Sequence, residues 1–197
     1  MNIEIVQQKI LEEIADYDFN GRPFILAIDG RCASGKSTFA NKLSALTGAT
    51  VIHADDFFLQ PFQRTEKRLE TPGENVDWER IKTQVLMPLS REETAYYRPF
   101  DCHTMSFGKE LSAAPVKVVV VEGTYSLNKE LAEFYSSSVF MTVSPKIQLE
   151  RITARNGHEG AEMFKKKWIP LEEKYFSAYD LSLIHISEPT RLGMISY

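Results

Sequence analysis

The stretch AIDGRCASGKST, residues 27–38, decides the fold of this chain. Its glycines, lysine and serine follow the spacing G-x-x-x-x-G-K-S, in which backbone N–H groups and a helix N-terminus converge on the phosphates of a nucleoside triphosphate. Lys36 is expected to bring a positive charge to the β and γ phosphates, and the Ser37 hydroxyl to bind Mg²⁺. The motif leaves open whether water, a protein or a small molecule receives the phosphate. The residues expected to hold the nucleotide are Gly30, Ala33, Ser34, Gly35, Lys36, Ser37 and Thr38.

The segments around this loop alternate between strand and helix patterns. Residues 23–29 form an apolar strand before the loop, and after it Phe39, Leu43 and Leu46 share one face of a helix that Gly48 ends. The run VKVVVVEG at 116–123 is apolar on both faces, as in a central parallel strand. The pattern predicts an α/β fold with helices on both faces of a parallel sheet. Further strands are expected at 50–55 and 137–143, and further helices within 1–20, from Asp77 to about Leu86, from Ser144 onward, and over 161–179.

Length and composition limit the class of protein. The 197 residues are 43% hydrophobic, enough for one domain with a full core, and the net charge of −4 argues against a nucleic-acid partner. The two cysteines indicate neither a disulfide framework nor a metal cluster. The N-terminus lacks the pattern of a signal peptide, and no apolar run is long enough to span a membrane. We expect a cytoplasmic protein that acts on a small molecule, and the sequence does not decide whether it forms homo-oligomers.

Acidic residues are expected at the carboxyl ends of two strands, where ligands bind in parallel sheets. Asp55 and Asp56 end the strand at 50–55, and strand alternation would send their side chains to opposite sides. One of them would suit a general base that accepts a proton from an attacking hydroxyl. Glu122 ends the valine run and is expected to coordinate Mg²⁺, directly or through water.

Two arginines and a group of polar and aromatic residues are weaker candidates. Arg151 and Arg155 are four residues apart, so they share a helix face and could stabilise charge over the phosphates from a lid at 151–165.

Asp77 is expected to cap a helix and, second, to contact substrate. The segments 57–75, read as a polar loop, and 91–112 are expected to be insertions on the substrate side. Within and next to them, Tyr97, Phe100 and Trp78 could stack on a base or equally belong to the core, and Asp101 follows Phe100 as a substrate-binding candidate.

The ordered strings DGRCASGKST, HADDFF, ENVDWERI, YRPFDC, VVVVEGTYS and LERITARNG resemble uridine kinase-like proteins of the phosphoribulokinase/uridine kinase family, over about residues 20–180. The resemblance implies a P-loop kinase fold and transfer of phosphate from ATP to a small-molecule hydroxyl, typically the 5′-hydroxyl of uridine or cytidine. It also implies Asp55 as the catalytic carboxylate, Asp77 as a ribose contact, and Ser37 with Glu122 as the metal site. Arg151 and Arg155 match the lid arginines. The string FDCH departs from the family's base pocket, so another small alcohol could be the substrate.

Several alternatives remain open. A nucleoside monophosphate kinase, a pantothenate- or phosphoribulose-type kinase, and a nucleotide-binding protein without turnover all contain such a loop. A GTP switch is disfavoured, because no N-K-x-D string follows the loop.

The segment 181–197 does not match the rest of the chain. Residues 181–191, LSLIHISEPTR, are the in-frame translation of a transposase-type sequencing adapter, and ISY at 195–197 continues the match. We therefore expect one kinase domain over 1–180, with its final edge strand missing, and a non-native segment that packs poorly and contributes no site residue.

Overall fold

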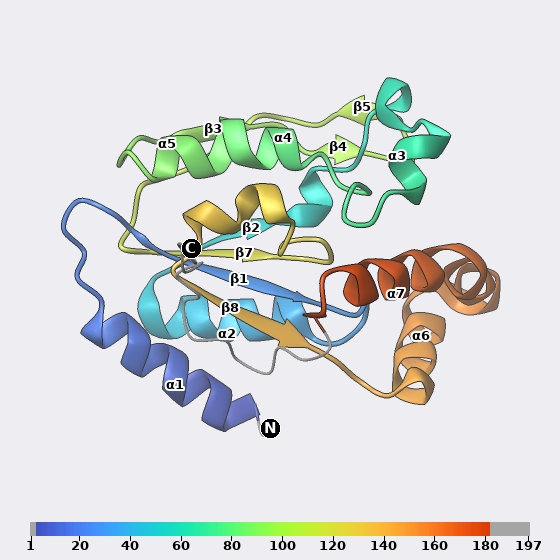
Figure 1. Cartoon of the computed structure of the whole chain (residues 1–197), viewed down its shortest axis with the longest axis horizontal. Helices are drawn as coiled ribbons and strands as arrows, with labels where there is room; N and C mark the ends of the chain where they lie inside the picture. The colour runs from blue at the N-terminus through green and yellow to red at the C-terminus, as the bar shows by residue number, and fades with distance from the viewer. Residues whose placement is uncertain (1–2, 182–197) are drawn as a thin grey trace, which may run out of the picture.

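Four apolar strands form a parallel sheet at the centre of the computed structural model, which describes residues 3–181. Within those residues the strand order is β2-β7-β1-β8 (Figure 1). The predicted central strand is in place, because β7 lies between β2 and β1 and all of its side chains are buried. The strands are β1 (Phe24–Gly30), β2 (Thr50–His53), β7 (Val118–Glu122) and β8 (Ser137–Met141).

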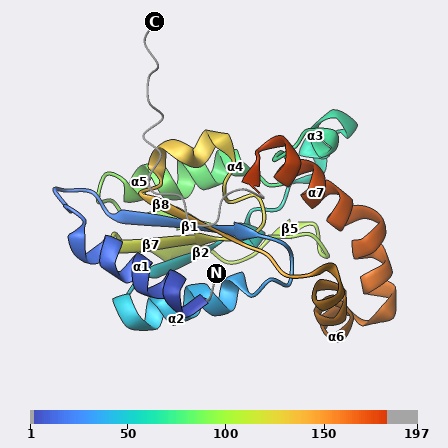
Figure 2. The same cartoon turned by 60° about the horizontal axis from the view of Figure 1, so that its bottom comes forward.

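Side-chain alternation along the strands divides the core into two layers. On β1, Leu26 and Ile28 face the helices α1 and α2, whereas Ile25 faces the opposite layer. On β7, Val120 and Val121 divide in the same way. Figures 1 and 2 show α1 and α2 on one face of the sheet, and α4, α5 and α7 on the other. The α/β fold predicted from the sequence, with helices on both faces, is confirmed.

The helices largely follow the predicted positions. Gly48 ends α2 in the left-handed conformation, the Asp77 side chain accepts from the backbone N–H of Arg80 at the start of α4, and Ser144 caps α6. Of the three residues expected on one face of α2, Phe39 and Leu43 are buried, whereas Leu46 is 55% exposed. The helices are α1 (Ile3–Asp16), α2 (Lys36–Thr47), α3 (Glu66–Glu70), α4 (Trp78–Arg80), α5 (Met87–Leu89), α6 (Pro145–Met163) and α7 (Ile169–Ala178).

Short helical turns and small strands complete the fold. The segment η3 continues α4 into α5, and η5 joins α6 to α7, each as a π-helical stretch. The 3₁₀ turns are η1 (Ala54–Asp56), η2 (Pro61–Gln63) and η4 (Lys129–Phe134), and the π-helical segments are η3 (Ile81–Leu86) and η5 (Phe164–Trp168). The small strands, which pair antiparallel as β3 with β6 and β4 with β5, are β3 (Ala95–Tyr97), β4 (Phe100–Asp101), β5 (Ser106–Phe107) and β6 (Leu111–Ala113).

Two local expectations are wrong. The strand predicted over 50–55 ends at His53, because the chain turns into η1, closed by a bond of 2.9 Å from Phe57 N to Ala54 O. The segment 57–75 is not simply a polar loop: Phe57 is fully buried in the core, and the segment contains η2 and α3. The second helix expected over 161–179 is confirmed: it follows the break at Gly157, where φ is 71°, and continues through η5 and α7 to Ala178.

The C-terminal segment lies almost entirely outside the described residues. The expectation for 182–197, including the missing edge strand, therefore stays a prediction. Leu181 is the one residue of the segment that the structure describes. It is 3% exposed and packs in the core layer that contains Tyr175, so the expectation that the segment packs poorly is wrong for Leu181. In residues 3–181, no helix has the length and apolar character needed to cross a membrane.

Candidate active site

The predicted phosphate loop connects β1 to α2. Gly30 has φ 138°, and a Cβ there would lie 1.9 Å from the carbonyl oxygen of Met141, so the neighbouring strand requires glycine. The Lys36 side chain is buried and its Nζ donates to Gly30 O and Arg31 O, both at 2.9 Å. The charged end of Lys36 therefore lies within the loop. The other predicted nucleotide residues occupy the same loop and the first turn of α2, where Ser37 and Thr38 are exposed: Ala33, Ser34, Gly35, Ser37 and Thr38.

The predicted metal pair comes together at the carboxyl edge of the sheet. Ser37 Oγ donates to Glu122 Oε1 at 2.9 Å, and His53 Nδ1 lies 2.6 Å from the same oxygen. The register of the parallel strands explains the contact with His53, because His53 on β2 is paired directly with Glu122 on β7. Glu122 is 5% exposed. The hydrogen bond with Glu122 raises the pKa of His53, while burial acts in the opposite direction.

Asp55 and Asp56 both lie on η1, directly beyond β2. Burial raises the pKa of Asp55, even though its carboxylate reaches solvent, and the charge of Lys36 acts in the opposite direction. Glu122 raises this pKa further, so Asp55 lies within electrostatic reach of both the loop lysine and the predicted metal pair. Burial also raises the pKa of Asp56, and the charge of His53 and, more weakly, that of Arg80 lower it. The two carboxylates thus have different surroundings, although they do not alternate along a strand.

The two predicted lid arginines lie on one face of α6, before the break at Gly157. Arg151 Nη1 donates to the backbone oxygen of Ala33 at 3.0 Å, so it contacts the phosphate loop directly. Arg155 donates to Asn156 at 2.8 Å, and its charge lowers the pKa of Asp55. Both side chains are exposed. The structure therefore brings both arginines to the side of the molecule that carries the loop and Asp55.

The predicted substrate residues divide into buried and exposed positions. Tyr97 and Phe100 are 7% and 4% exposed, and Tyr97 stacks on Phe57 with ring centroids 5.1 Å apart. Tyr97 therefore belongs to the core layer that contains Phe57, whereas the Phe100 ring packs edge-to-face on Phe107 with ring centroids 5.2 Å apart. Asp77 is 1% exposed and caps α4. Asp101 is exposed, and its carboxylate accepts from the backbone amides of His103 and Thr104, so it stabilises a turn.

Sequence reasoning missed three polar residues around the loop, of which Asp29 and Glu172 are buried. His53 lies just before the predicted pair Asp55 and Asp56, and it contacts Glu122 because β2 pairs with β7 in the sheet. Asp29 is fully buried and accepts from Gly30 N at 2.5 Å and from Tyr175 Oη at 2.7 Å. Glu172 of α7 accepts from Cys32 N at 3.2 Å. A charged residue within an apolar strand was a signal for Asp29, whereas the sequence carries no signal that brings Glu172 to the loop.

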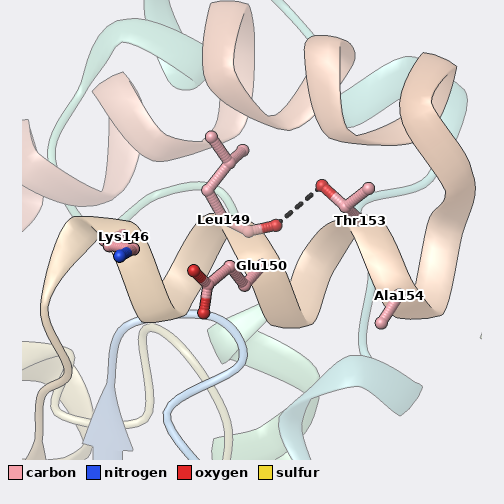
Figure 3. Close-up of a pocket in the computed structure, with 5 residues that line it drawn as sticks. All are labelled: Lys146, Leu149, Glu150, Thr153 and Ala154. Carbon is pink, nitrogen blue, oxygen red and sulfur yellow. Dashed lines mark hydrogen bonds between the residues drawn. The ribbon is translucent and has the colours of Figure 1, made fainter.

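A separate surface hollow lies along α6 (Figure 3). Thr153 Oγ1 donates to Leu149 O at 2.8 Å there, which is an ordinary bond within a helix. None of the predicted site residues lines this hollow. Its lining residues are Lys146, Leu149, Glu150, Thr153 and Ala154.

Comparison with curated proteins finds relatives named uridine kinase. The sequences from two strains of Ureaplasma parvum are each 26% identical over 134 residues. The match covers 63% of this chain and 64% of each relative, so it spans slightly under two thirds of the relatives' length. No family model matches the chain.

Comparison with solved structures finds kinases over almost the whole chain. A possible uridine kinase from Bacillus stearothermophilus has a TM-score of 0.67 and 22% identity, with 93% of this chain and 94% of that chain covered. The chain therefore has the P-loop kinase fold and is uridine kinase-like in sequence.

Two further P-loop kinases share the fold. A protein provisionally described as a fructose transport system kinase, from Silicibacter sp. TM1040, has a TM-score of 0.70 and 21% identity over 90% of this chain and 95% of that chain. D-glycerate 3-kinase from Cryptococcus neoformans var. grubii has a TM-score of 0.61 and 14% identity, with 87% of each chain covered. At these identities the likeness shows the fold alone.

Proposed function

We propose that this chain is an ATP- and Mg²⁺-dependent kinase that transfers the γ-phosphate to a hydroxyl group of a small molecule. The observation that carries the proposal is the position of Asp55. Its carboxylate lies within electrostatic reach of Lys36 in the phosphate loop and of Glu122 at the sheet edge. A base at this position can accept a proton from a hydroxyl that attacks the terminal phosphate.

Each residue in this arrangement has a role in the transfer. Asp55 takes the proton of the acceptor hydroxyl while the hydroxyl oxygen bonds to the γ-phosphorus. The bond from that phosphorus to the β–γ bridging oxygen breaks, and ADP leaves. Lys36 stabilises the charge on the β and γ phosphates, and Arg151 and Arg155 supply positive charge from the lid side.

The residues at the sheet edge fit Mg²⁺. A serine hydroxyl and a carboxylate, 2.9 Å apart, are oxygen ligands of the kind that this ion prefers, and Mg²⁺ commonly keeps several waters besides one or two protein ligands. When bound, Mg²⁺ neutralises charge on the β and γ phosphates. His53 holds Glu122 in place through their 2.6 Å contact.

Uridine or cytidine is the first candidate acceptor, because the curated relatives are named uridine kinase. A sugar or a hydroxy acid is the second candidate. The observation that favours it is the burial of Tyr97 and Phe100, since rings packed against other aromatic side chains offer little free surface to a base. Both candidates use the same base and the same phosphate loop.

A phosphoryl-transfer assay tests the proposal. ATP and MgCl₂ are incubated with the protein and a panel of uridine, cytidine, UMP, fructose, D-glycerate, pantothenate and ribulose 5-phosphate. ADP is followed enzymatically and the product by mass spectrometry. We expect ADP formation that depends on one acceptor and is lost in Asp55→Asn. ADP release without any acceptor would indicate an NTPase, and ATP binding without turnover on an extended panel would indicate a nucleotide-binding protein.

A further inference from the structure

Helices α7 and α6 form hydrogen bonds to the backbone of the phosphate loop on either side of Ala33. Glu172 of α7 accepts from the backbone N–H of Cys32 at 3.2 Å. Arg151 of α6 donates to the backbone oxygen of Ala33 at 3.0 Å. Glu172 is 4% exposed, and its carboxylate also lies 3.5 Å from Gln148 Nε2 of α6. The two contacts restrain the backbone immediately before and after Ala33.

Ala33 has a backbone conformation that requires such support. Its φ is 60°, in the left-handed region, although it is not a glycine. A non-glycine residue in this region is strained and keeps its conformation only when the surrounding structure enforces it. The conformation of Ala33 directs the N–H groups that follow it, and these belong to the predicted phosphate-binding set.

The position of α7 against the loop is itself well determined. Tyr175 is fully buried and donates to the buried carboxylate of Asp29 at 2.7 Å. Arg31 forms an ion pair with Glu173, and its guanidinium lies 5.5 Å from the ring centroid of Phe176. Helix α7 thus contacts Asp29 near the end of β1 and the loop residues Arg31 and Cys32.

We propose that Glu172 is a positioning residue of the phosphate loop: through the N–H of Cys32 it keeps Ala33 in its left-handed conformation, and in this way it raises the affinity for the nucleotide phosphates. The inference rests on the proposed nucleotide-binding function. Glu172 acts on the nucleotide only through the loop backbone. Removal of its acceptor oxygen should therefore weaken nucleotide binding, and a residue that tolerates φ 60° at position 33 should compensate.

Calorimetric titration of the full chain with MgADP tests the proposal. Glu172→Met retains the length of the side chain and removes the carboxylate, and we expect roughly tenfold weaker binding, as for the loss of one hydrogen bond to a charged group. Glu172→Gln retains an acceptor oxygen and should bind within about twofold of the wild type. Ala33→Gly should restore much of the affinity lost in Glu172→Met, because glycine adopts a positive φ readily. Lys174→Met is the matched control on the same helix: Lys174 is exposed and its amine donates to the backbone oxygen of Glu70, outside the loop, so this variant should bind within about twofold of the wild type.

The outcomes separate this inference from the proposed function. Circular dichroism checks that each variant is folded. If Glu172→Met does not fold, Glu172→Asp decides, because it keeps the charge but is one methylene too short to reach Cys32 N, and we expect the same weakening. A folded Met or Asp variant that binds MgADP as tightly as the wild type overturns the inference and leaves the kinase proposal intact. A wild type that binds no MgADP removes the proposed function, and this inference with it.

Discussion

The Ser37 hydroxyl donates to Glu122 Oε1 over 2.9 Å, although the two residues are 85 positions apart in the chain. Ser37 belongs to the first turn of α2, and Glu122 to the end of β7. The parallel sheet brings them together, because β7 is hydrogen-bonded to β1, the strand that leads into the loop. The contact between Ser37 and Glu122 is the basis of the first prediction.

Glu122→Gln should raise the Mg²⁺ concentration that is needed for half-maximal turnover by about 10- to 100-fold, the range found when groups that support a metal site are removed. The amide keeps the shape of the side chain but loses the negative charge. A titration of turnover with MgCl₂ at saturating ATP measures the change. Glu133→Gln, at an exposed residue that pairs with Lys82, is the matched control and should leave the Mg²⁺ dependence unchanged. Equal curves for both variants would contradict a metal site at Glu122.

Asp55→Asn should lower turnover roughly 10²- to 10⁴-fold, the usual contribution of a positioned proton acceptor. ATP affinity should change little, because the loop at 30–37 holds the phosphates. Asp56→Asn should affect stability or acceptor KM more than turnover, since the cations that act on Asp56 are His53 and Arg80, whereas Lys36 of the loop acts on Asp55. Steady-state kinetics and ATP titrations on both variants measure this. If Asp56→Asn is the inactive variant and Asp55→Asn is active, the base is assigned to the wrong neighbour.

The pH dependence of turnover should report Asp55. Burial raises the pKa of this carboxyl above its ordinary value of 3.8, although Lys36 and Arg155 act against the shift, and Glu122 adds to it. A general base must be ionised, so turnover should fall as the pH is lowered through this raised pKa, and the midpoint should lie above 3.8. The residual activity of Asp55→Asn should lack this acidic limb. If turnover of Asp55→Asn still falls at low pH with the same midpoint, a group other than Asp55 is responsible for the fall.

Gly30→Ala should destabilise the protein strongly, because the added Cβ would lie 1.9 Å from Met141 O on β8. Gly21→Ala is a matched control, since Gly21 also has a positive φ, of 75°, but no atom lies within 4 Å of the position of its Cβ. The control should cost only the backbone strain, about 1–2 kcal/mol. Thermal unfolding of both variants compares the two costs. A Gly30→Ala variant as stable as Gly21→Ala would mean that β1 and β8 can separate at low cost.

Local spacing in the sequence was sufficient for the parts of the fold that depend on neighbouring residues. The G-x-x-x-x-G-K-S spacing predicts the loop, the valine run predicts β7, and Ser144 with Pro145 predicts the start of α6. These signals are reliable because the strand, the cap and the loop are each formed by residues close together in the chain.

The expectations that were wrong concern places where tertiary packing overrides the local pattern. Asp55 and Asp56 continue a strand pattern, but the chain bends at Ala54, so their surroundings differ for a reason other than alternation. Phe57 follows a polar pair and still inserts into the core, where it meets Tyr97. In each case a contact between distant segments decides the conformation.

The sequence by itself determined the identity of the phosphate loop, the α/β alternation and the candidate residues Lys36, Ser37 and Glu122, because each depends on spacing or position within one element. Only the tertiary structure decided that His53 contacts Glu122 and that Glu172 contacts Cys32. The first contact depends on the register of two parallel strands, and the second on how α7 packs against the loop. Neither contact can be recognised from a short stretch of sequence, because the partners are 69 and 140 positions apart. They are brought together by the burial of side chains that lie elsewhere in the chain.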